Sequence, residues 1–108
     1  MRVKLRDIAE VIRSKNSGPY ELTLDIIFKD WEMFDKIVKS GKFNSRLIAD
    51  LYDIDEKDVF GIVEFIPAKA IKATLRRKIV SGGIGDTDVY GAQQHAPLLD
   101  VEFELEGE

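Results

Sequence analysis

The residues best suited to chemistry in this chain are its only histidine, His95, and two nearby aspartates, Asp86 and Asp88. The ordinary pKa of histidine lies near neutral pH, so its side chain can accept or donate a proton. The aspartates are two residues apart, so in a loop both could converge on one cation. These three are the candidate catalytic residues. The competing interpretation is a structural histidine with aspartates that cap turns.

The same stretch, SGGIGDTDVYGAQQHAPLLD over residues 81–100, is rich in glycine and polar residues. Such a run cannot build a core, and it is typical of a loop kept for backbone geometry or for contact with another molecule. It lacks the lysine of a P-loop and the third glycine of GxGxxG, so it matches no nucleotide-binding motif. Two interpretations of this stretch therefore remain, a wide hairpin loop and a loop that binds another molecule. The candidate ligand- or partner-binding residues here are Ser81, Gly82, Gly83, Gly85, Thr87, Tyr90, Gln93 and Gln94.

A second polar segment, SKNSGP over residues 14–19, has the composition of a turn. Its candidate binding residues are Ser14, Lys15 and Asn16. If this segment and the glycine-rich stretch are both hairpin tips, they could lie at the same end of a sheet. A solvated turn with a surface lysine is the alternative.

The length, cysteine content and net charge of the chain exclude several classes of function. The chain has 108 residues, no cysteine and a formal net charge of −4. This length predicts one domain over residues 1–108. Phosphate-backbone binders are normally basic, so nucleic acid is not expected as a partner. The absence of cysteine removes thiolate catalysis and cysteine-zinc sites, and no metal or cofactor is expected. No window resembles a membrane span or a secretory signal, so we expect a soluble cytoplasmic protein.

Hydrophobic periodicity predicts most of the secondary structure. Residues 20–28 alternate as a strand. Asp30 is the expected N-cap of a helix that Gly41 ends, and a second helix is expected from near Asn44 to Asp53. Residues 60–66, FGIVEFI, form another predicted strand. Residues 3–13 fit either a helical stripe or a strand, and we favour the strand.

Two charged segments decide the C-terminal half. Residues 100–106 alternate acids with Val, Phe and Leu, which indicates a strand. Residues 69–79 have high helix propensity but also alternate, with five cations and no acid from Lys69 to Lys78. Antiparallel pairing of the two would place Lys72 and Arg76 among the acids. This charge match favours a strand over a helix at 69–79. We therefore expect an α+β fold in the order β-β-α-α-β-β-β, with two helices on one face of a mainly antiparallel sheet.

The runs LRDIAEVIRSKNSGPYELTLDIIF, AIKATLRR and GDTDVYGAQQHAPLL resemble the AtuA-related small-protein family, the domain of unknown function 4387. That family is similar to the C-terminal small domain of AtuA-type proteins, which is named after a protein of acyclic terpene utilisation. In those domains the first loop reads RSGDKGD. Residues 13–18 here, RSKNSG, keep its Arg, Ser and Gly but not its aspartates. Asp86 or Asp88 could supply those acids.

The resemblance implies a ferredoxin-like α+β domain that works as a small accessory subunit. Its implied partner is an AtuA-type large protein, whose site it would complete or cap. The implied chemistry is of hydratase or lyase type on carboxylic or acyl-CoA substrates. Two other classes stay open. One is a self-sufficient ligand-binding domain or enzyme that uses residues 81–95, and the other is a structural homo-oligomer with paired sheet edges.

Overall fold

The computed structural model describes residues 2–18, 20–77 and 96–105. Secondary structure covers most of this part of the chain. The elements in order are β1 (Arg2–Lys4), α1 (Leu5–Ile8), β2 (Ala9–Asn16), β3 (Glu21–Phe28), α2 (Trp31–Ser40), α3 (Ser45–Tyr52), η1 (Glu56–Asp58), β4 (Val59–Phe65), η2 (Ile66–Ala68), β5 (Ala70–Arg76), α4 (Ala96–Leu99) and β6 (Glu102–Glu104).

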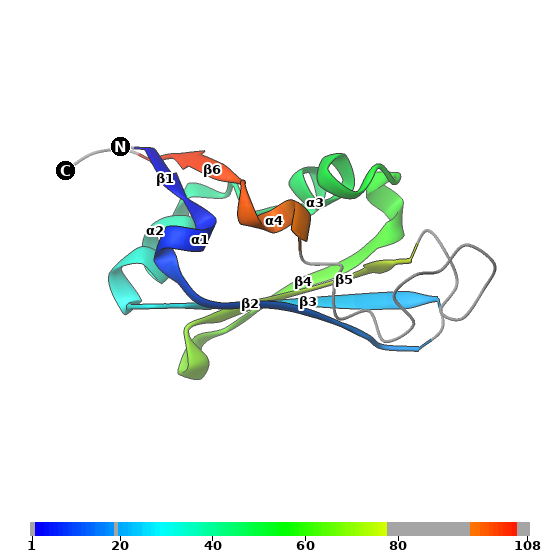
Figure 1. The fold of residues 1–108 in the computed structure, drawn as a ribbon, viewed down its shortest axis with the longest axis horizontal. Coiled ribbons are helices and arrows are strands. Elements are labelled where there is room, and N and C mark those ends of the chain that lie inside the picture. Colours follow the sequence, from blue (N-terminus) through cyan, green and yellow to red (C-terminus); the bar gives the residue numbers. More distant parts are fainter. Residues whose placement is uncertain (1, 19, 78–95, 106–108) are drawn as a thin grey trace.

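The strands form two antiparallel sheets. The larger has four strands in the order β2-β3-β5-β4, and the smaller pairs β1 with β6. Helices α1 to α4 lie on one side of the four-stranded sheet, and among the described elements only the short η2 turn lies toward its other side (Figure 1). We call this other side the open face. The expected α+β class with helices on one face is confirmed. The expected order β-β-α-α-β-β-β in one sheet is wrong, because the described residues form six strands in two sheets and add the short helices α1 and α4. The ferredoxin-like topology is not confirmed by this strand order.

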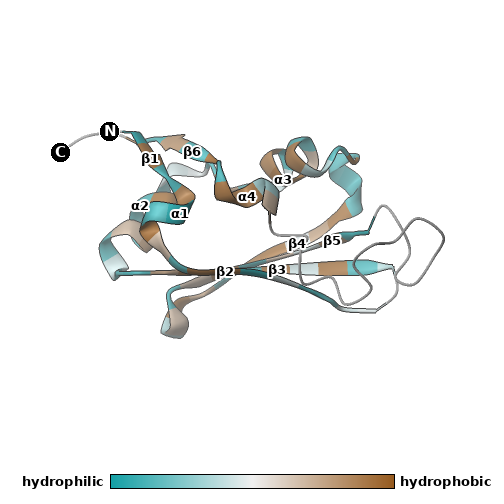
Figure 2. Cartoon of the chain, in the orientation of Figure 1, coloured by the Kyte–Doolittle hydropathy of each residue, from teal (hydrophilic) through white to brown (hydrophobic). Residues whose placement is uncertain are grey.

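The core lies between the sheet and the helices. Along β3 every second side chain points to the helices, and these four are at most 1% exposed: Leu22, Leu24, Ile26 and Phe28. On β5, Leu75, Ala73 and Ile71 continue the same layer opposite the first three. Hydrophobic and hydrophilic residues alternate along the strands (Figure 2). Each fully buried large apolar side chain contributes about 1.5–3 kcal/mol, so this layer dominates the stability.

The two predicted helices form where their caps indicated. The Asp30 carboxylate accepts a hydrogen bond from the Met33 backbone N–H at 2.8 Å, and Gly41 ends α2 with φ of 69°. The Asn44 side chain accepts from the Leu47 N–H at 2.9 Å at the start of α3. No helix among the described residues is long and apolar enough to cross a bilayer.

The strand expected over residues 69–79 is confirmed over Ala70–Arg76 by β5, and residues 78–79 lie outside the described chain, but the predicted pairing with the acidic C-terminal strand is wrong. Strand β6 pairs with β1, which sets Arg2 opposite Glu104 and Lys4 opposite Glu102. The Arg2 guanidinium lies 3.3 Å from the Glu104 carboxylate. The acids of β6 therefore lie beside a basic strand, but that strand is β1 at the N-terminus and not β5.

In the strand register, two cations of β5 lie opposite acids of β3 instead. Lys72 lies opposite Asp25, and Arg76 lies opposite Glu21. Charge alternation correctly indicated that the acidic strand and the basic strand each need a neighbouring strand of opposite charge. It could not choose between two basic segments, because both β1 and β5 carry suitable cations.

Residues 3–13 contain both of the structures that their pattern allowed, a strand and a helical turn. The strand favoured for residues 3–13 is interrupted by the single helical turn of α1, which buries Leu5 and Ile8. The turn predicted at residues 14–19 begins later than expected. Ser14, Lys15 and Asn16 belong to β2, and the chain bends at Ser17 and Gly18, where φ is 122°.

We expect the change Asp30→Ala to lower the free energy of unfolding by about 1 kcal/mol, because it removes the α2 N-cap. Urea unfolding measures this loss. Asp35→Ala, at an exposed position of the same helix, is the matched control and should change stability by less. Equal losses in the two variants would show that the cap has no special role.

Candidate functional site

Most of the predicted site falls on residues 78–95, which lie outside the described part of the chain. This applies to the candidate catalytic residues His95, Asp86 and Asp88. It also applies to the remaining candidates of that stretch, Ser81, Gly82, Gly83, Gly85, Thr87, Tyr90, Gln93 and Gln94. The functional geometry that the structure does describe lies on the four-stranded sheet.

The three candidates of the first polar segment are divided between two sides of β2. Ser14 lies opposite Leu24 and Asn16 opposite Leu22, on the side that the helices cover. Lys15 lies opposite Thr23, on the open face. A strand alternates its side chains, so these three residues cannot converge on one ligand. Of the three, only Lys15 belongs to the site described below.

The strand registers arrange the open-face residues in three rows that cross β2, β3, β5 and β4. We name them by polarity. The rows are Val11, Ile27, Ala70 and Phe65 (the apolar row); Arg13, Asp25, Lys72 and Val63 (the ionic row); and Lys15, Thr23, Thr74 and Gly61 (the polar row). Successive rows are about 7 Å apart, because they are two residues apart along each strand. The open face therefore changes from apolar to charged to polar along the strand direction.

A groove of about 400 Å³ lies on this face. That volume is within the range typical of small-molecule sites. Its walls come from the apolar and ionic rows, from Lys15, and from Ala68 of η2. The groove residues are Arg13, Lys15, Asp25, Ile27, Val63, Phe65, Ala68, Ala70 and Lys72. The groove is thus apolar on one side and cationic on the other.

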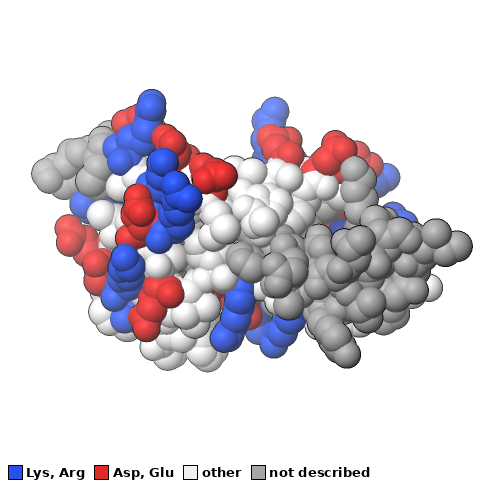
Figure 3. Space-filling view, viewed as in Figure 1, with Lys and Arg blue, Asp and Glu red and all other residues white. Residues whose placement is uncertain are grey.

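One carboxylate and three cations line the groove. The Asp25 side chain is only 9% exposed, and its Oδ2 accepts from Arg13 Nε at 3.3 Å. Lys15 and Lys72 are exposed, and neither has a carboxylate within ion-pair distance among the described residues. Figure 3 shows Lys and Arg side chains emerging on the side of the sheet away from the helices. The groove therefore carries two positive charges beyond its internal ion pair.

Beside the groove, β4 forms one edge of the sheet and carries a run of exposed apolar side chains. Phe60, Val63 and Phe65 of β4, and Ile66 directly after it in η2, are each more than half exposed. Only β5 pairs with β4 among the described strands, so the outer backbone groups of β4 face away from the sheet. Natural proteins usually protect such an edge with charges, prolines or a covering segment. The β4 edge carries one exposed acid, Glu64, and its other large exposed side chains are apolar.

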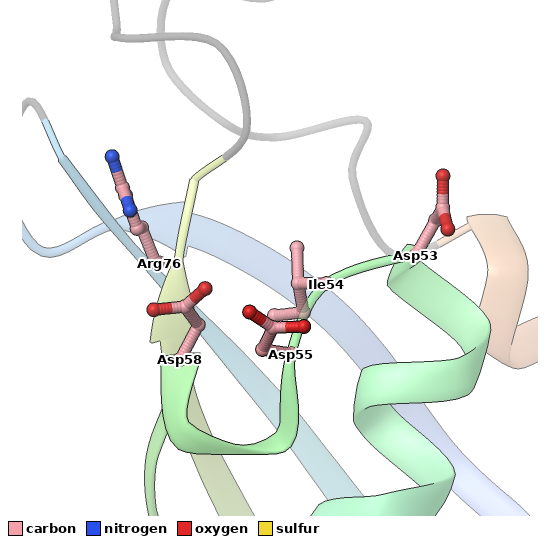
Figure 4. Close-up of a pocket in the computed structure, with 5 residues that line it drawn as sticks. All are labelled: Asp53, Ile54, Asp55, Asp58 and Arg76. Atoms are coloured by element: carbon pink, nitrogen blue, oxygen red, sulfur yellow. The ribbon is translucent and has the colours of Figure 1, made fainter.

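A second, polar pocket lies where α3 leads into β4, lined by Asp53, Ile54, Asp55, Asp58 and Arg76. Figure 4 shows Asp55 and Asp58 facing the same space, with Asp53 apart at the end of α3. Asp53 is the C-cap of α3, and the Asp55 carboxylate lies 3.9 Å from Lys57 Nζ. Within the described ranges, no group of three or more acids or histidines is placed to hold a metal ion. Asp53 ends α3 through its backbone, with φ of 55°, and Asp55 precedes η1 without a side-chain capping hydrogen bond.

The groove was missed at the sequence level, although its residues left a signal. Val11, Arg13 and Lys15 alternate along β2, and FGIVEFI places apolar residues on both sides of β4. Either pattern alone fits an ordinary strand. Only the registers, which align these residues with Asp25 and Lys72, make them one site.

Comparison with known proteins gives one family. The family model described as a domain of unknown function, DUF4387, matches residues 5–102. No curated protein and no solved structure matches the chain.

We expect Arg13→Gln to lower the free energy of unfolding by about 1 kcal/mol, because it leaves the buried Asp25 carboxylate without its partner. Asp25→Asn removes the charge that needs a partner. In a double-mutant cycle by urea unfolding, the coupling energy between the two changes should be about 0.5–1 kcal/mol. Additive losses would show that the ion pair does not stabilise the sheet.

Proposed function

We propose that this chain, which belongs to the DUF4387 family, is a small accessory subunit. It binds a larger protein through the edge of β4 and the adjoining open face, and it completes a site on that partner. The observation that carries this proposal is the exposed apolar edge of β4.

The geometry of the β4 edge favours a protein as the molecule that binds there. A partner strand added to β4 would pair with its outer N–H and C=O groups, and its side chains would cover exposed apolar residues. Phe60 and Ile66 are 54% and 59% exposed, at either end of this strand. The edge carries one exposed acid, Glu64, and a bulge between Val59 and Gly61, but its large apolar side chains still favour aggregation unless a partner covers them. A subunit that is normally bound has such a covering partner.

Charge supports a different protein over a second copy of this chain. Lys15 and Lys72 give the open face a positive excess on a chain of net charge −4. A second copy would bring the same positive face to the contact. A larger partner with acidic residues around its docking strand would neutralise it.

The resemblance to AtuA-type proteins suggests which partner to test. It implies an AtuA-type large protein and chemistry of hydratase or lyase type on carboxylic or acyl-CoA substrates. In this arrangement the small subunit contributes one wall of the substrate site, and residues 81–95 remain candidates for contact with partner or substrate. The small chain alone is then not expected to turn over substrate.

We expect the chain to co-purify with an AtuA-type large protein from the same genome, and to change the turnover of that protein. The double variant Phe60→Glu/Ile66→Glu should weaken the complex at least tenfold, because it buries two charges at the docking edge. Isothermal titration calorimetry measures the affinity. Neither residue lines the groove, so the variant tests docking alone.

Tyr20→Glu is the matched control, because Tyr20 is 62% exposed and precedes β3, away from the β4 edge. It should leave the affinity unchanged. Absence of binding and of any change in turnover would overturn the proposal. A stable homodimer that Phe60→Glu/Ile66→Glu disrupts would replace the larger partner with a second copy.

A further inference from the structure

We infer that the open-face groove binds a small molecule with a carboxylate head and an apolar chain. This inference deepens the proposed function by giving its site a ligand class. It rests on the groove residues alone, however, and it is tested on the isolated chain. Its failure can therefore be distinguished from failure of partner binding.

The apolar half of the groove fits a hydrocarbon chain. Ile27, Ala70 and Phe65 lie side by side across three strands, and Ala68 of η2 adds to the wall. Phe65 is 58% exposed although it is large and apolar, so a ligand can still remove much of its surface from water. Burial of apolar surface favours binding in proportion to the area covered.

The cationic half fits a single compact anion. The Asp25 carboxylate is paired with the Arg13 guanidinium at 3.3 Å. Lys15 on β2 and Lys72 on β5 lie on either side of β3. The lysine ammonium groups are flexible point charges with three donors each, so both can reach one carboxylate placed between them. Asp25 repels a second anion, but the lysines outnumber it.

The arrangement favours a carboxylate over a phosphate. Phosphate sites commonly combine lysines with arginine forks or with the backbone N–H groups of a helix N-terminus. The arginine of this groove is already paired, and the groove residues lie on strands and in the short η2 turn. The ionic row is about 7 Å from the apolar row, so the head and chain of one ligand reach both at once.

Octanoate is the probe, added to the isolated full-length chain with its backbone amides followed by NMR. We expect saturable shifts confined to β2, β3, β4, β5 and the η2 turn. Octylamine, with the same chain and a cationic head, should bind at least tenfold more weakly, and acetate should not saturate. Equal binding of octylamine, or shifts confined to the helical layer, would overturn the inference. Displacement of octanoate by an equal concentration of inorganic phosphate would overturn the carboxylate assignment.

Variants assign the head group to named residues. Lys72→Gln and Lys15→Gln should each weaken octanoate binding about fivefold, the loss expected for one exposed charge pair. Asp25→Asn should strengthen binding, because it removes the repulsion and releases Arg13. Lys39→Gln, at an exposed position of α2, is the matched control and should change nothing. Equal effects of Lys39→Gln and Lys72→Gln would contradict the assigned site.

Discussion

The structure depends on one constraint, which is that the described helices cover only one face of a four-stranded sheet. Strand β3 shows the consequence. Its even-numbered side chains, from Leu22 to Phe28, form the floor of the core, while Thr23 and Asp25 point the other way. Those two polar residues are nevertheless buried, at 4% and 7% exposure. Neighbouring side chains contact them, with Ser17 Oγ 2.6 Å from Thr23 Oγ1 and Arg13 Nε 3.3 Å from Asp25 Oδ2.

The burial of Asp25 determines how charges are arranged on the open face. A buried carboxylate at Asp25 needs a cation, and Arg13 on the neighbouring strand provides it. The two lysines nearby exceed what Asp25 can balance, so the groove remains positive in a chain that is acidic as a whole. The neighbouring β4 edge is apolar instead. One surface thus joins an apolar edge, suited to a protein, with a cationic groove, suited to a carboxylate.

Local signals predicted local structure well. The Asp30 cap and the Gly41 stop fixed α2, and alternation fixed β5 and β6 as strands. Long-range pairing was less predictable, because the acidic β6 could pair equally well by charge with β1 or β5. The turn begins later than the composition predicts, because Ser14 and Asn16 have turn propensity but are held in β2 by pairing with β3.

The site could be predicted only in part for the same reason. Lys15 was singled out for its polar surroundings, whereas Arg13, Lys72 and Phe65 look like ordinary strand residues until the registers align them. The chemistry suggested by His95 lies outside the described residues and stays a prediction.

The most direct test of the central claim, that the open face and the β4 edge are the functional surface, is hydrogen–deuterium exchange of the chain with and without an AtuA-type large protein. The account predicts that the partner slows exchange of β4 amides and of the adjoining η2 turn, and leaves α2 and α3 unchanged. Slower exchange on α2 and α3, with β4 unchanged, would contradict it.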